Sequence, residues 1–155
     1  MTLRHRRRLF WRGAILVAVV ALGAACVAPA RTAAAYEGKA ADSASSAVSA
    51  LRTAILAAGL GGADRSFPPT VSVLLSEAEE DADATEAAFS SIQPPDAVSD
   101  QIRAELEPML IKASKRLALL RIAARRADLG ALPGLAQPLE RLAGKLDRFA
   151  QEHAA

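Results

Sequence analysis

Few residues of this chain combine the type and the spacing that catalysis requires. The two histidines, His5 and His153, lie near opposite ends of the sequence, so neither is predicted to enter a core as a base or a metal ligand. Four serines share one predicted helix: Ser43, Ser45, Ser46 and Ser49. No histidine accompanies them to activate a nucleophile, and the Glu-x-x-His pairs of di-iron bundles are missing. The sequence therefore predicts a protein that is not an enzyme and that has no cofactor and no metal centre.

Cys26, the only cysteine, is the one residue with a candidate covalent chemistry. The sequence Gly23-Ala24-Ala25-Cys26 is similar to a bacterial lipobox, the motif in which a cysteine thiol is acylated, although Gly23 stands where that motif usually has leucine. Cys26 is therefore a candidate lipidation site. Ala28-Pro29-Ala30 is an A-x-A sequence, so cleavage after Ala30 is a competing outcome.

Both motifs lie in residues 1–30, which have the parts of an export signal. A basic head of five arginines precedes an apolar tract at 13–30, whose roughly 18 residues at about 1.5 Å each approach the thickness of a bilayer core. The arginines should hold the N-terminus in the cytoplasm and place residues 31–155 outside. Four outcomes stay open for 13–30: an uncleaved anchor in the cytoplasmic membrane, cleavage and secretion, lipidation, or a hairpin that is not exported. Arg7-Arg8-Leu9-Phe10 is similar to a twin-arginine motif, so Sec and twin-arginine export both stay open.

The charge of the chain is divided between its two parts. The formal net charge is +2, but residues 1–30 hold five arginines and no acid, so residues 31–155 hold 14 basic and 17 acidic residues. The basic excess therefore belongs to targeting, and nucleic acid is not an expected partner. A single cysteine excludes an internal disulfide, so packing alone must stabilise residues 31–155.

The pattern of apolar residues in 31–155 predicts an all-α fold. Four amphipathic helices are expected, at about 31–58, 69–92, 96–128 and 135–153. The short connections between them favour an antiparallel up-and-down four-helix bundle, preceded by the N-terminal signal or anchor helix.

Turn-forming and helix-breaking residues set the predicted boundaries. The glycines of 59–62 should stop the first helix, and Pro133-Gly134 should form the last turn. Asp96 should cap the third helix. Pro108 lies inside that helix, where it should cause a kink or a break into two helices.

Steps of three and four residues predict the buried side of each helix. The second helix has Val71, Leu75, Ala78, Ala82, Thr85, Phe89 and Ile92. The third has Ile102, Leu106, Met109, Ala113, Leu117, Leu120 and Ala124, and the fourth has Leu135, Leu139, Leu142, Leu146 and Phe149. The first helix is lined mainly by alanine, so its neighbours must approach closely.

The second and third helices have opposite charges. Between Ser66 and Gln101 there is no Lys or Arg, whereas residues 77–86 include six acids. The predicted partner surface consists of Glu77, Glu80, Asp83, Arg121, Arg125 and Arg126. One alternative is a solvated face with ion pairs such as Glu86 with Arg103 and Glu77 with Lys112. The others are a divalent cation site on the acids and contact of the basic residues with anionic lipid headgroups or an acidic envelope polymer.

The order of segments resembles that of small Ala-rich helical envelope proteins of high-GC Gram-positive bacteria. The residues with this resemblance are Tyr36-Glu37-Gly38-Lys39-Ala40, Leu74-Leu75-Ser76-Glu77-Ala78-Glu79 and Leu120-Arg121-Ile122-Ala123-Ala124-Arg125-Arg126. The resemblance implies export and a helical domain. That type of protein has no known activity, so the resemblance implies no mechanism.

These features together predict a non-enzymatic interaction or scaffold module on the outer face of the cytoplasmic membrane. Its expected partner is another envelope protein, and its oligomeric state is left open. The alternative is a bundle that binds a small ligand or a lipid in its core, where the alanines of the first helix would leave room.

Overall fold

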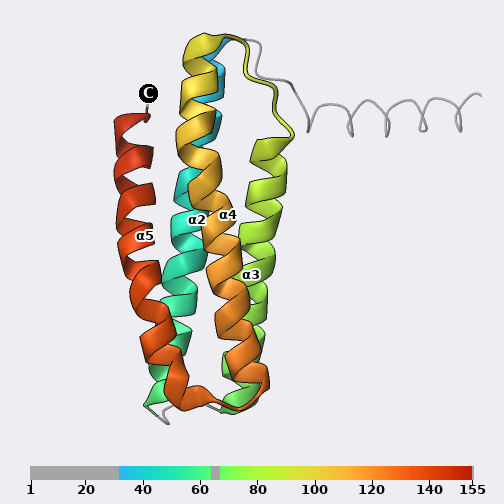
Figure 1. Cartoon of the computed structure of the whole chain (residues 1–155), viewed down its shortest axis with the longest axis vertical. Coiled ribbons are helices and arrows are strands. Elements are labelled where there is room, and N and C mark those ends of the chain that lie inside the picture. Colours follow the sequence, from blue (N-terminus) through green and yellow to red (C-terminus); the bar gives the residue numbers. More distant parts are fainter. Residues whose placement is uncertain (1–31, 64–66, 155) are drawn as a thin grey trace, which may run out of the picture.

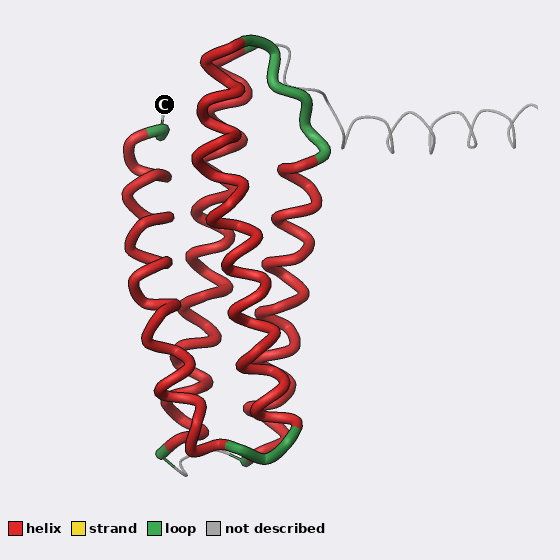
Figure 2. Tube along the Cα trace, in the orientation of Figure 1, coloured by secondary structure: helices red, strands yellow, loops and turns green. Residues whose placement is uncertain are grey.

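The computed structural model describes residues 32–63 and 67–154, and these residues form an all-α domain. Its elements are α2 (Ala33–Gly62), α3 (Pro68–Ser90), α4 (Ala97–Arg125), the short 3-10 helix η1 (Leu129–Ala131) and α5 (Leu132–Glu152). Figure 1 shows the four long helices packed side by side, and Figure 2 shows that only short links join them. The prediction of an all-α protein with four packed helices is confirmed.

Helix α2 makes the most extensive contacts in the bundle. It packs against α3, α4 and α5, and the links that follow it fall at alternating ends of the molecule (Figure 1). Twelve of its residues are buried, and most of them are alanine. Because alanine adds little bulk, three helices can approach α2 at once, which explains why the first helix lacks large apolar side chains.

The core is made of leucine layers closed at one end by two aromatic rings. Tyr36 on α2 and Phe89 on α3 are fully buried, with ring centroids 5.7 Å apart and a tilt of 52°. The predicted stripes of α3 and α5 are largely buried, although Thr85, Ile92 and Leu135 are only partly covered. On α4 the stripe contains Leu110, which the spacing missed, while Met109 is only partly buried.

The predicted end of the first helix is wrong, because α2 continues through all three glycines to Gly62. None of these glycines has a positive φ, so none forms a left-handed cap. Two of them allow close approach instead. A Cβ on Gly61 would lie 3.1 Å from Val71, and a Cβ on Gly62 would lie 2.4 Å from Cγ of Pro133.

Helix α4 begins as predicted but does not break. The Asp96 side chain accepts a hydrogen bond of 2.9 Å from the Ser99 backbone N–H, which caps the helix. Pro108 is exposed, and α4 is one helix from Ala97 to Arg125. Of the two outcomes predicted at Pro108, a kink or a break into two helices, the break is therefore wrong, because an outward proline ring leaves the buried side of the helix intact.

The last turn also differs from the prediction. Pro133 and Gly134 lie in the first turn of α5, which begins at Leu132. Proline suits this position because the backbone N–H groups in the first turn of a helix make no intrahelical hydrogen bond, so the missing N–H of proline costs nothing there. The turn is instead made by residues 126–131, with Ala127 at φ 57°.

Helix α2 is also the described segment that is long and apolar enough to cross a membrane. Length and composition do not distinguish a spanning helix from one surrounded by other helices, and in this structure α2 is half covered by the bundle. The segment predicted to enter the membrane, 13–30, lies outside the described residues, as do Cys26 and Ala30.

Candidate functional site

The acids of the predicted partner surface lie along the outer side of α3. Glu77, Glu80 and Asp83 are exposed, as is Asp81. None of them has a basic group within 4.0 Å among the residues that the structure describes. These four residues therefore form a row of solvated negative charge, which we call the α3 acidic row.

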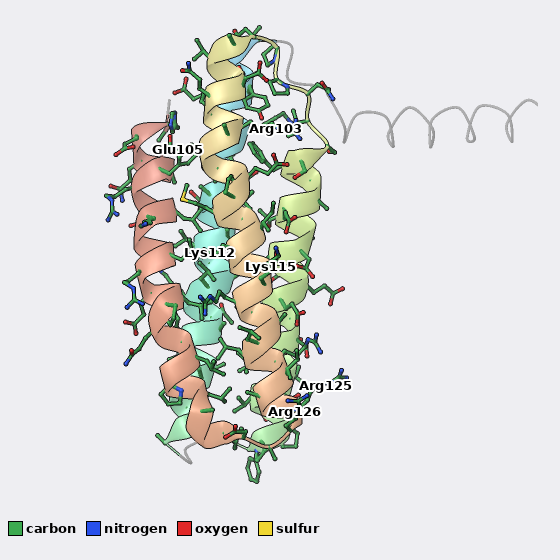
Figure 3. The ribbon with its side chains drawn as sticks, in the orientation of Figure 1. Arg103, Glu105, Lys112, Lys115, Arg125 and Arg126 are labelled. Carbon is green, nitrogen blue, oxygen red and sulfur yellow. The ribbon has the colours of Figure 1, made fainter. Side chains whose placement is uncertain are left out.

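The basic residues lie on α4, with two apolar side chains between them. Figure 3 shows Lys112, Lys115, Arg125 and Arg126 on this helix, the two arginines near the end that leads to α5. Leu119 and Ile122 are 45% and 37% exposed and lie in line with Lys115 and Arg126. We call Lys115, Leu119, Ile122 and Arg126 the α4 ridge.

One predicted partner residue is occupied within the bundle. Arg121 binds both carboxylate oxygens of Glu79 on α3, and the Nη2–Oε1 distance is 3.1 Å. The hydrogen bond with Glu79 raises the pKa of Arg121 above its ordinary value. Arg121 therefore joins α3 to α4, while Arg125 and Arg126 have no ion pair with another described residue.

The pairing expected between Glu86 and Arg103 is wrong. Arg103 donates to the Ser90 carbonyl at 2.8 Å and to the Ile92 carbonyl at 3.3 Å, and it pairs with Glu107. The link 91–96 climbs past the end of α3 before α4 begins (Figure 1), which shifts the register of the two helices. The expected pair of Glu77 with Lys112 is likewise not formed.

Arg103 and Glu107 form a polar clamp at the end of α3. The Ser90 hydroxyl donates to Glu107 at 2.9 Å, and Arg103 donates to the carbonyls that α3 leaves unpaired. Hydrogen bonds from Arg103 and then from Ser90 lower the pKa of Glu107. Sequence reasoning missed this clamp because its members meet only in the observed register.

A groove between α2 and α3 is a further feature that the sequence did not predict. It is open to solvent and has a volume of about 550 Å³. Its lining consists of Ser46, Ser49, Ala50 and Thr53 from α2 and Asp81, Ala84, Thr85 and Ala88 from α3. We call it the α2–α3 groove. All side chains except Asp81 are small and uncharged, so the helices present a concave, mildly acidic surface.

Two further ionisable side chains, His153 and Tyr36, lie at the end of the bundle where α2 begins. His153 Nδ1 lies 2.8 Å from a Glu37 carboxylate oxygen, which ties the end of α5 to the start of α2. Burial raises the pKa of the Tyr36 hydroxyl, which has no hydrogen-bond partner among the described residues. Within residues 32–63 and 67–154, no three His, Cys, Asp or Glu side chains converge as metal ligands.

Comparison of the chain with known protein families, with curated proteins and with solved structures gave no match.

Proposed function

We propose that this protein is a non-enzymatic interaction module of the bacterial envelope. Its helical bundle is held at the outer face of the cytoplasmic membrane and binds another envelope protein through the surfaces of α3 and α4. The observation that supports this most is the separation of exposed charge: the acidic row lies on one helix and the basic residues on the next, and Arg121 and Glu79 form the one ion pair between them within the described part.

Exposed charges that have no ion pair within the fold are available for contact with another molecule. Opposite charges on neighbouring helices would stabilise a bundle if they paired, yet Glu77, Glu80 and Asp83 have no such partner among the described residues. Exposed charges steer partners together and select among them, even where they add little stability to the fold.

A ligand in the core has less support than a partner on the surface. The alanines of α2 are covered by the helices that face them, and the 550 Å³ groove opens to solvent between α2 and α3. The space that the small side chains leave between α2 and α3 is therefore a surface groove and not a cavity in the core.

The localisation part of the proposal depends on residues 1–30. We propose an antiparallel up-and-down bundle preceded by a signal or anchor helix at 13–30, with Cys26 and Ala30 as alternative sites of lipidation and cleavage. The intact mass and N-terminal sequence of the protein from membrane and medium fractions distinguish these forms. A full-length chain in the membrane supports an anchor, and a chain that starts at Cys26 with added acyl mass supports a lipid tether. A chain that starts at Arg31 in the medium contradicts attachment.

The binding part is tested by photo-crosslinking in intact cells. A photoreactive residue at Asp83 or Arg125 should capture a protein, because both side chains are exposed and unpaired among the described residues. The same probe at Gln137, an exposed residue of α5, is the control. Equal capture at all three positions would contradict a specific surface on α3 and α4.

A further inference from the structure

We propose that the α4 ridge of one copy docks in the α2–α3 groove of a second copy. This inference rests on the proposed function and names the partner as the same chain. Two surfaces on this molecule are complementary in shape and charge, and they lie on different helices.

The groove has the dimensions of a helix seat. On each helix its lining residues recur at steps of three and four: Ser46, Ser49, Ala50 and Thr53 face Asp81, Ala84, Thr85 and Ala88. Each row runs over eight residues, and its first and last Cα atoms are about 10 Å apart along the helix. Small side chains in two parallel rows let a third helix approach as closely as helices pack within a bundle.

Three of the four hydroxyl groups in the groove can be covered without losing a hydrogen bond. Ser49, Thr53 and Thr85 donate to carbonyl oxygens on their own helices, at 3.2, 3.1 and 2.7 Å. These hydroxyls therefore keep their hydrogen bonds when water leaves the groove. Covering a polar group costs little free energy when its partner is already present.

The α4 ridge provides the matching apolar surface. Leu119 and Ile122 are spaced by three residues at the centre of the ridge, with Lys115 and Arg126 on either side. Both apolar side chains are exposed, at 45% and 37%. Their removal from water in the groove would supply an apolar contact that the free molecule lacks.

Charge favours the same pairing. Asp81 lies in the groove, and Glu77 and Glu80 lie beside it on the outer side of α3. Lys115 and Arg126 lie at the two ends of the ridge, so one of them can meet these acids when Leu119 and Ile122 occupy the groove. Attraction between exposed charges of this kind falls as salt is added.

The arrangement is head-to-tail. Because α2 and α4 pack against each other through their inner sides, the ridge on α4 and the groove beside α2 face different directions. A contact between two different surfaces leaves one ridge and one groove free in every pair, so the association extends to chains or rings.

The test uses full-length chains with two different tags, co-expressed and solubilised in detergent. Recovery of the second tag with the first measures association. Ala84→Arg places a large cationic side chain in the groove, and Ile122→Glu replaces an apolar side chain of the ridge with a negative charge. Both positions are exposed, so neither substitution changes the core. Each variant co-expressed with itself should lower recovery by about tenfold or more.

Co-expression of Ala84→Arg with Ile122→Glu should restore recovery of the second tag, because the intact ridge of the first variant can dock in the intact groove of the second. The product should be a pair, because no further ridge and groove are both intact. Lys145→Glu, at an exposed lysine of α5, is the control and should leave recovery unchanged. Recovery that persists in both single variants, or that the mixture fails to restore, overturns the proposal.

A second measurement separates this inference from the proposed function. A photoreactive residue at Ala88 should form a crosslink to the peptide of the second copy that spans residues 115–126. A crosslink to a different protein overturns self-association and leaves the interaction function standing. A crosslink to lipid, or to no protein at all, also overturns self-association, whereas the proposed function is contradicted only if the probes at Asp83 and Arg125 fail as well.

Discussion

Alanine at Gly59 and at Gly62 should change the stability of the bundle in opposite directions. Both glycines are helical and neither has a positive φ, so alanine fits the backbone at both positions. At Gly59 an added Cβ meets no atom within 4 Å. Gly59→Ala should therefore raise the free energy of unfolding by about 0.5–1 kcal/mol, through helix propensity alone.

At Gly62 the same atom meets a rigid neighbour. The added Cβ would lie 2.4 Å from Cγ and 2.8 Å from Cδ of Pro133, in the first turn of α5. A proline ring cannot rotate away, so α2 and α5 must separate, and overpacking of this kind costs about 1–3 kcal/mol. After the gain in propensity is subtracted, Gly62→Ala should lower the free energy of unfolding by about 0.5–2 kcal/mol.

Urea unfolding of the full-length protein, followed by far-UV circular dichroism, measures both effects. The double variant with Pro133→Ala is the control, because it removes the ring atoms that the new Cβ would meet. In that background Gly62→Ala should lose most of its cost. If Gly59→Ala and Gly62→Ala shift the midpoint equally, or if Pro133→Ala leaves the cost of Gly62→Ala unchanged, close approach is not the reason for glycine at position 62.

Four further variants, at three positions, test the polar groups of the bundle. Tyr36→Phe removes a buried hydroxyl that has no described partner, so it should stabilise the protein by about 0.5–1 kcal/mol in the same urea assay. Hydrogen bonds, chiefly from Arg103, hold the pKa of Glu107 below its ordinary value of 4.5, so its carboxylate adds stability above that pH. This stability is lost as the pH falls through the folded pKa, and Glu107→Gln should flatten the fall in urea midpoints between pH 5 and pH 3. Asp96→Ala removes the cap on Ser99 and should lower the melting temperature, whereas Asp96→Asn, which can still accept the hydrogen bond, should preserve it.

The sequence was sufficient for the helices because their periodicity is a local property. Steps of three and four identify the buried sides of α3 and α5, and Asp96 caps α4 as its side chain predicts. The glycines of 59–62 were misjudged because glycine has two uses, as a helix end and as a site of close approach. At Gly62 the choice between these two uses depends on Pro133, which lies on another helix and so cannot be located from the local sequence.

The candidate surfaces were predicted in part. The charged residues of α3 and α4 were identified, but their pairing was not, because the extended link 91–96 sets a register that residue types do not encode. The α2–α3 groove was missed altogether. Its alanines, serines and threonines are common in any helix of this composition, and they become a concave surface only when α2 and α3 lie in the observed alignment.

The packing of α2 against all three later long helices has a consequence for how the protein is made. This helix is synthesised before the three helices that cover it, and its twelve buried residues lack their full set of partners until α5 has emerged. At about 5–20 residues per second, that interval lasts roughly 5–20 s. Throughout this time the apolar side of α2 is exposed, so the unfinished chain must be kept from aggregating through it.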